Sequence, residues 1–219
     1  MGHRPHLYLP PPWTGPNIQL NNSQRHHLRS VLRLADGELV TYTDGLGATG
    51  SGQVSGDSVM RADEQNRKPP RLRLTLAVAP PRDKDRTRFL VEKAAELEVT
   101  RLVWLDTRYG NGHPPPPTKA QAWAVAGLEQ SRGAYLLEVK EVMLGPDALA
   151  AWGGEVWFAD EGGGAIPSPT PDTITVAIGP EGGWAPEELP VGAARFGLGR
   201  TILRVETAAL AAAVLLLRL

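Results

Sequence analysis

The chain has 219 residues, 42% of them hydrophobic, and a formal net charge of −1 at pH 7. This hydrophobic share supports a packed core and argues against wholesale disorder, while the balanced charge leaves nucleic-acid binding to local basic patches. The absence of cysteine excludes disulfides, thiolate zinc sites and cysteine nucleophiles.

The two ends of the chain carry no signal for export or membrane insertion. The first residues have no apolar signal core, and the longest apolar run, Ala208–Leu217, is too short to span a bilayer. We therefore expect a soluble cytoplasmic protein that has no membrane partner.

Residues 1–68 are predicted to form a small β-rich unit. Short apolar segments such as Glu38–Thr43 alternate with turn signals such as Gly50-Ser51-Gly52. Closely spaced short strands joined by glycine turns favour a small β-barrel.

A predicted helix, Gln24–Leu34, interrupts these strands and is basic. It carries His26, His27, Arg29 and Arg33. The histidine pair lacks a third metal ligand at a suitable spacing, so we expect no metal site and interpret the helix as an RNA-facing or plain surface.

A linker ending at Pro69-Pro70 separates this unit from residues 71–219, where strands and helices alternate. That alternation is typical of an α/β fold with a mostly parallel sheet. The predicted strands are Leu72–Val78, Arg101–Leu105, Val156–Ala159 and Thr173–Ile178. Two predicted helices begin at the capping residues Asp85 and Thr118. A third predicted helix spans Glu206–Leu219 at the end of the chain.

The sequence Gly179-Pro180-Glu181-Gly182-Gly183 directly follows the last predicted strand. Loops at the carboxyl ends of parallel strands are where α/β proteins bind ligands, and glycines let a ligand approach backbone amides. A tight turn with no ligand is the alternative, and no Walker signature follows.

A second loop leads from Leu198-Gly199 through Ile202-Leu203-Arg204 into the start of a helix at Glu206. Taken alone, this pattern is an ordinary strand–loop–helix connection. Arg204 is the exception, because a cation between apolar residues needs a partner if it is buried.

Two basic segments are candidates for phosphate contact. Residues 82–88 place four cations, Lys84 and Arg86 among them, at a strand-to-helix junction. Gln130-Ser131-Arg132 ends a predicted helix. Solvated surface is the alternative for both.

In combination and order, these motifs resemble the bacterial 16S rRNA uridine-N3 methyltransferase family of the SPOUT superfamily. The motifs are GPEGG, LGxxILRxETA, KxxR…EKAxEL and EQSR, together with the N-terminal His26-His27-Leu28 segment. The resemblance implies a trefoil-knotted parallel sheet flanked by helices at 71–219, a PUA-like RNA-binding barrel at 1–68, and a homodimer. It also implies the cofactor S-adenosylmethionine and a substrate in 16S rRNA of the 30S subunit.

The resemblance assigns roles to individual residues as expectations. Those expected to bind the cofactor are Gly179, Pro180, Glu181, Gly182, Gly183, Leu198, Gly199, Ile202, Leu203 and Arg204, with a weaker assignment at Ala159-Asp160-Glu161. Those expected to take part in catalysis are Arg132, Arg204 and Glu206. Those expected to contact RNA are Arg33, Lys84, Arg86 and Arg132.

The chain departs from the family pattern at two turns. Glu98 replaces a glycine that would cap a helix, so the turn is expected to close differently. After GPEGG, Trp184-Ala185-Pro186 lacks a hydroxyl cap, and Pro190 limits any helix there to about one turn.

Three other functions compete with the uridine-N3 assignment. The same fold could methylate another RNA target, or the protein could bind RNA in ribosome assembly without catalysis. A nucleotide-phosphate site at GPEGG is disfavoured by the acidic Glu181.

Overall fold

The structure, a computed structural model, describes residues 4–152, 154–166 and 172–217. The chain divides into two compact units. Unit 1 consists of Met1–Pro69 and Leu128–Leu136, and unit 2 consists of Pro70–Gly127 and Leu137–Leu219. The end of one helix and its following turn thus group with the N-terminal residues.

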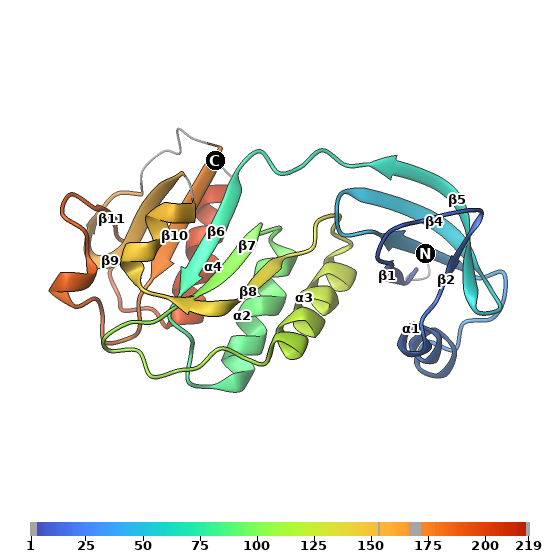
Figure 1. Cartoon of the computed structure of the whole chain (residues 1–219), viewed down its shortest axis with the longest axis horizontal. Coiled ribbons are helices and arrows are strands. Elements are labelled where there is room, and N and C mark those ends of the chain that lie inside the picture. The colour runs from blue at the N-terminus through green and yellow to red at the C-terminus, as the bar shows by residue number, and fades with distance from the viewer. Residues whose placement is uncertain (1–3, 153, 167–171, 218–219) are drawn as a thin grey trace. The chain divides into compact units, whose positions relative to one another are not determined.

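Unit 1 is built on a five-stranded sheet with the order β1-β3-β4-β5-β2 (Figure 1). Strands β1 and β3 are parallel and the other pairs are antiparallel. The strands are β1 His6–Tyr8, β2 Asn17–Gln19, β3 Leu39–Thr43, β4 Ala48–Ser55 and β5 Ser58–Asn66. The small N-terminal β unit is confirmed as a curled sheet, and its PUA-like character stays a prediction.

The predicted basic helix of unit 1 is shorter than expected. Helix α1, Asn22–His26, continues as a π-helical turn η1, His27–Val31. Leu28 on this turn is fully buried against the sheet core. The helix ends before Leu34 because Arg33 adopts a left-handed conformation, with φ of 56°.

Unit 2 contains a six-stranded parallel sheet with the order β11-β9-β10-β6-β7-β8. The strands are β6 Arg73–Val78, β7 Arg101–Leu105, β8 Glu138–Leu144, β9 Glu155–Gly164, β10 Thr173–Ile178 and β11 Ala194–Phe196. Side chains of β6, β7 and β10 are buried on both faces, as expected for a parallel sheet between two covering layers.

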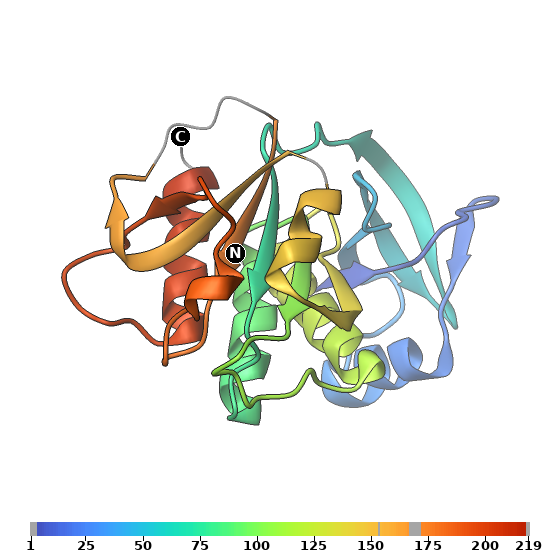
Figure 2. The ribbon, with the colours of Figure 1, turned by 60° about the vertical axis from the view of Figure 1, so that its left-hand side comes forward.

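Helices cover both faces of this sheet. Helices α2 (Lys84–Glu96) and α4 (Val205–Leu217) pack side by side behind it in Figure 2, and the 3-10 helix η2 (Pro146–Trp152) lies in front. Helix α3 runs from Pro117 to Ser131 and ends in unit 1. The α/β class with a parallel sheet flanked by helices is confirmed, and the trefoil knot stays a prediction.

The helix starts differ from the predicted caps. Asp83, not Asp85, caps α2, because its side chain accepts hydrogen bonds from the backbone N–H groups of Asp85 and Arg86. Helix α3 begins at Pro117, so Thr118 lies inside the helix and does not cap it. Helix α4 begins at Val205, and the predicted final two residues lie outside the described part of the chain.

The expectation that the turn after α2 closes in an unusual way is wrong. The N–H of Val99 donates to the carbonyl of Ala94 and that of Glu98 to Ala95, at 3.0 and 3.1 Å. This is the pattern of a Schellman turn, with Glu98 in the left-handed conformation at φ of 58°. Glutamate therefore occupies the position that glycine favours.

The left-handed conformation strains the backbone of Glu98, which leads to a prediction about stability. Glu98→Gly is expected to raise the free energy of unfolding by about 0.5–1 kcal/mol, since a left-handed non-glycine residue costs about 1–2 kcal/mol and the freer unfolded chain offsets part of that. Urea unfolding and amide exchange in α2 measure the change. Glu96→Gly, inside the helix, is the control and should destabilise α2. Loss of stability in Glu98→Gly would show that the turn is unstrained.

Candidate functional site

A pocket of about 330 Å³ opens in unit 2 at the end of β10, beside residues of the neighbouring parallel strand β9. Ile178, the last residue of β10, is paired with Ala159 on β9, so the segment after β10 begins beside Ala159–Glu161 of β9. Three segments and one helix residue line this glycine-loop pocket: Ala159–Glu161, Ile178–Trp184, Leu198–Gly199 with Thr201–Leu203, and Ala208 of α4. Position and size both suit a small-molecule ligand.

The GPEGG segment forms a tight turn at the pocket wall. The N–H of Gly183 donates to the carbonyl of Pro180 at 2.9 Å, and Gly183 has a φ of 77°, which favours glycine. A Cβ on Gly179 would lie 2.9 Å from the Trp184 indole. The indole N–H donates to the carbonyl of Ala159 at 2.9 Å. The glycines thus serve both the turn and the close packing of Trp184.

The segment after GPEGG closes without a hydroxyl cap. It forms the single 3-10 turn η3, Pro186–Glu188, as the sequence predicted. The Glu188 carboxylate accepts hydrogen bonds from the N–H of Ala185 at 2.8 Å and from that of Arg108 at 2.7 Å. One carboxylate therefore replaces the missing cap and connects the segment to the loop after β7.

The second predicted loop forms the opposite wall. Leu198 and Gly199 line the pocket together with Ile202 and Leu203, and the Ile202 side chain is 73% exposed. On the β9 side, Asp160 lines the pocket and forms an ion pair with Arg195. An exposed apolar side chain at a pocket rim suits contact with a flat ligand or with another chain.

The structure brings together nine of the ten residues expected to bind the cofactor. Arg204 is the exception, because it is exposed and does not belong to the described lining. The weakly assigned Ala159, Asp160 and Glu161 do belong to it. The expected cofactor residues did not include four lining residues, Ile178, Trp184, Thr201 and Ala208. Ile178 and Trp184 had a signal, through their positions directly before and after GPEGG.

Arg204 lies instead in a charged cluster at the starts of α2 and α4. Backbone N–H groups of Arg86 and Asp85 hold the pKa of Asp83 below its ordinary value, and the charges of Arg86 and Arg204 add to this effect. Glu206 lies on the first turn of α4, with Oε1 3.8 Å from Arg86 Nε. The cluster therefore joins three of the predicted catalytic or RNA-binding residues.

Glu206 is the unusual member of this cluster. Its side chain is 9% exposed, and its Oε2 atom has no hydrogen-bond partner among the described residues. A buried carboxylate oxygen without a partner costs free energy, which makes Glu206 a candidate for a functional role. The same helix contributes Ala208 to the pocket, two residues further on.

The remaining predicted RNA contacts are distributed over both units. Lys84 is exposed on the first turn of α2 in unit 2. Arg33 is exposed at the end of η1 in unit 1. Arg132 also lies in unit 1, after α3, and does not belong to the described lining of the glycine-loop pocket. Glu206 belongs to the other unit, unit 2.

No group of three or more His, Asp or Glu side chains in residues 4–152, 154–166 and 172–217 is arranged to hold a metal ion. Within the same ranges, no helix has both the length and the apolar character needed to cross a membrane.

A parallel α/β unit with a glycine-lined pocket at the end of a strand is the arrangement in which α/β proteins bind nucleotides and cofactors. The sequence makes the class specific: residues 67–217 match the RNA methyltransferase domain family, and the chain belongs to that family. A relative from Synechocystis, named ribosomal RNA small subunit methyltransferase E, is 28% identical over 214 residues, which cover 87% of this chain and 69% of the relative.

Solved structures of similar proteins agree over both units. A ribosomal RNA small subunit methyltransferase E from Neisseria gonorrhoeae, bound to S-adenosyl methionine, is 25% identical with a TM-score of 0.85, covering 97% of this chain and 96% of the other. A probable rRNA-methyltransferase from Porphyromonas gingivalis is 24% identical with a TM-score of 0.81, covering 96% of each chain. The second likeness shows the fold alone.

Proposed function

We propose that the protein uses S-adenosylmethionine to methylate N3 of a uridine in 16S rRNA of the small ribosomal subunit. One observation carries the proposal: a chain of the RNA methyltransferase domain family gathers nine of ten expected cofactor-loop residues around one pocket. The names of the relatives from Synechocystis and Neisseria gonorrhoeae support the RNA target.

The pocket residues fit this cofactor chemically. Glycine-rich backbone at 179–183 lets an adenosine moiety approach closely, and Leu198, Ile202 and Leu203 provide apolar contact. The carboxylates of Asp160, Glu161 and Glu181 suit a ligand that carries hydroxyls, an ammonium and a sulfonium. When bound, the cofactor supplies an electrophilic methyl group.

The protein then has to position the uridine and receive a proton. N3 lies on the Watson–Crick edge, so the base must be unpaired or flipped out before it reaches the pocket. N3 loses its proton as the nitrogen–carbon bond forms, and we assign the acceptor role to the Glu206 carboxylate. Arg86 and Arg204 hold phosphate or developing negative charge nearby.

We further propose a cytoplasmic homodimer with a knotted unit 2. Helix α4 is apolar around most of its circumference, and Leu215 on it is 46% exposed, which favours cover by a second copy. In a dimer, Arg132 of one copy could serve the pocket of the other. The knot and the PUA-like assignment of unit 1 follow from the family resemblance.

Methyl transfer from isotope-labelled S-adenosylmethionine to unmethylated 30S subunits and to naked 16S rRNA, with nucleoside identification, tests the proposal. Labelled 3-methyluridine is the expected product. A different labelled nucleoside would instead support another RNA target of the same fold. No label, together with retained RNA binding, would favour the non-catalytic assembly role.

A further inference from the structure

Tyr109 is an exposed aromatic residue beside the glycine-loop pocket. It lies in the loop that follows β7, and 52% of its surface is accessible. A Cβ on Gly182 would lie 3.1 Å from the Tyr109 Cβ, so Tyr109 packs against a residue of the pocket wall. Tyr109 does not itself belong to the described lining, which places it at the rim of the pocket.

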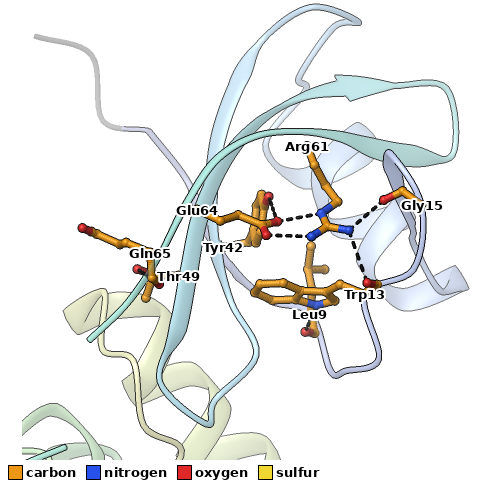
Figure 3. Close-up of polar contacts among 8 residues, drawn as sticks. All are labelled: Leu9, Trp13, Gly15, Tyr42, Thr49, Arg61, Glu64 and Gln65. Atoms are coloured by element: carbon orange, nitrogen blue, oxygen red, sulfur yellow. Dashed lines mark hydrogen bonds and ion pairs between the residues drawn. The ribbon is translucent and has the colours of Figure 1, made fainter. Parts of the chain in front are cut away.

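The aromatic residues of unit 1 show how the fold uses a ring for its own stability. Tyr42 is fully buried, and its hydroxyl donates a hydrogen bond of 2.7 Å to the Glu64 carboxylate (Figure 3). Trp13 packs edge-on against Tyr42, with ring centroids 5.0 Å apart, and its indole N–H donates to the Leu9 carbonyl at 2.8 Å. Arg61 donates two hydrogen bonds of 2.6 Å to Glu64. Partners within unit 1 thus occupy both rings and their polar groups.

The Tyr109 side chain has no such partners. Within residues 4–152, 154–166 and 172–217, its hydroxyl makes no hydrogen bond and its ring stacks on no aromatic ring or cation. A single exposed aromatic residue is common on protein surfaces and implies nothing by itself. A role for Tyr109 therefore depends on how its loop is held and on what lies beside it.

A tight turn, Thr107–Gly110, carries Tyr109. The N–H of Gly110 donates to the carbonyl of Thr107 at 3.1 Å, which closes the four-residue turn. A Cβ on Gly110 would lie 2.4 Å from Thr107 Oγ1, so the close approach requires glycine. Thr107 is buried, whereas Tyr109, the third residue of the turn, is exposed. The turn is thus fixed at its buried end and presents Tyr109 to solvent.

Contacts on both sides of Tyr109 hold the loop in place. The N–H of Arg108 donates to the Glu188 carboxylate of η3 at 2.7 Å. A Cβ on Gly112 would lie 1.9 Å from the carbonyl oxygen of Pro80, so the loop backbone lies directly against the segment between β6 and α2. Because both neighbouring segments belong to unit 2, the same scaffold that forms the pocket also positions Tyr109.

An unpaired base at the pocket would lie beside this ring. One anchor of the loop follows GPEGG, and the other leads into α2, where Arg86 contacts Glu206. The uridine that is methylated must leave its stack to reach the cofactor, and its faces then lose contact with the neighbouring bases. An aromatic side chain restores such contact, because every base has a π-face. Tyrosine suits a wet rim, since its ring gives apolar contact while its hydroxyl remains in water.

We propose that the Tyr109 ring stacks on the flipped-out uridine and positions its N3 for methyl transfer. The inference rests on the proposed function and adds to it a residue that fixes the plane of the base. Tyr109 acts as a positioning residue in this role, because it exchanges no proton and takes part in no bond that forms or breaks. The ring carries the role, and the hydroxyl does not.

Tyr109→Leu and Tyr109→Phe form a matched pair, because leucine keeps apolar volume without a planar ring and phenylalanine keeps the ring without the hydroxyl. The full-length variants methylate unmethylated 30S subunits in single-turnover reactions with saturating protein and cofactor. Tyr109→Leu is expected to lower the rate about tenfold or more, as for the loss of one base-stacking contact, and Tyr109→Phe to keep the wild-type rate. The Tm and the affinity for S-adenosylhomocysteine should stay unchanged in both variants, because Tyr109 is exposed and lies outside the described lining.

A photo-cross-linking experiment detects the contact without relying on methylation. The 30S subunits are reconstituted from a 16S rRNA transcript that contains 5-iodouridine, which couples on irradiation to an aromatic side chain stacked on it. Mass spectrometry is expected to find the cross-link at Tyr109, on the uridine that the wild type converts to 3-methyluridine. Tyr109→Phe should retain this cross-link, and Tyr109→Leu should lose it.

A wild-type rate in Tyr109→Leu, or an equal loss in Tyr109→Phe, would overturn the inference. So would a weaker affinity of Tyr109→Leu for S-adenosylhomocysteine, because Tyr109 would then act through Gly182 on the cofactor wall. If the wild type forms 3-methyluridine and Tyr109 neither cross-links nor affects the rate, the proposed function stands without this role. A cross-link at Tyr109 without any methylation by the wild type would overturn the proposed function and leave Tyr109 as a contact to an RNA base.

Discussion

Gly182→Val is expected to abolish binding of S-adenosylmethionine while the chain stays folded. Gly182 lines the glycine-loop pocket, and no positive φ makes the position intolerant of a side chain. A Cβ there lies 3.1 Å from Cβ of Tyr109, which is on an exposed loop and can shift slightly. The two methyl groups of valine would then occupy ligand space, so we expect affinity to fall at least about a hundredfold, or about 2.7 kcal/mol.

Calorimetric titration with S-adenosylhomocysteine measures this loss, and thermal unfolding verifies the fold. Gly164→Val is the matched control, because Gly164 lies on β9, outside the pocket lining, and a Cβ there meets nothing within 4 Å. The control should bind as the wild type does. Unchanged affinity in Gly182→Val would show that the cofactor binds elsewhere.

Local pattern was enough to predict the elements that carry this pocket. Strand β10 has the predicted bounds, Thr173–Ile178, because a strand buried on both faces appears as a continuous apolar run. The glycine cluster after this strand is also a local signal, and it identified the pocket wall because glycines at a strand end let a ligand approach the backbone. These features depend on neighbouring residues only.

Features that depend on distant partners could not be predicted. Strand β11, Ala194–Phe196, has three residues and no periodicity, and exists because it pairs with β9. Strand β8 carries Glu138, Lys140 and Glu141, so its composition does not indicate a strand. Nothing in the sequence indicated that segment 128–136 groups with the N-terminal residues.

The second loop shows the same limit at the level of single residues. Leu203 and Arg204 are adjacent, yet the first lines the pocket and the second belongs to the charged cluster with Asp83. Their different environments arise where the loop turns into α4, which sequence spacing does not reveal. Glu206 was identified as acidic at a helix start, but its burial was not predictable, nor was an oxygen that finds no partner in the described part of the chain.

Glu206→Gln is expected to lower kcat about a hundredfold while cofactor affinity stays unchanged. The substitution keeps size and removes only the capacity to accept a proton, a contribution typically worth about 10²–10⁴ in rate. The contact with Arg86 is loose, at 3.8 Å, and the buried Oε2 has no hydrogen-bond partner among the described residues, so neither interaction ties up the carboxylate. Single-turnover methyl transfer at several pH values measures this loss of rate. In the profile of rate against pH, the limb that reports the general base should disappear in the variant.

Arg86→Ala separates proton transfer from positioning. If Glu206 acts only by holding Arg86, both single variants lose the same activity, and the double variant loses no more than either one. If Glu206 accepts the proton itself, Arg86→Ala weakens RNA binding and spares most of the single-turnover rate, and the two losses add. A wild-type rate in Glu206→Gln would show that the buried carboxylate has a structural role. The N3 proton of the uridine would then leave directly to solvent, and Arg86 and Arg204 would only hold the RNA in place.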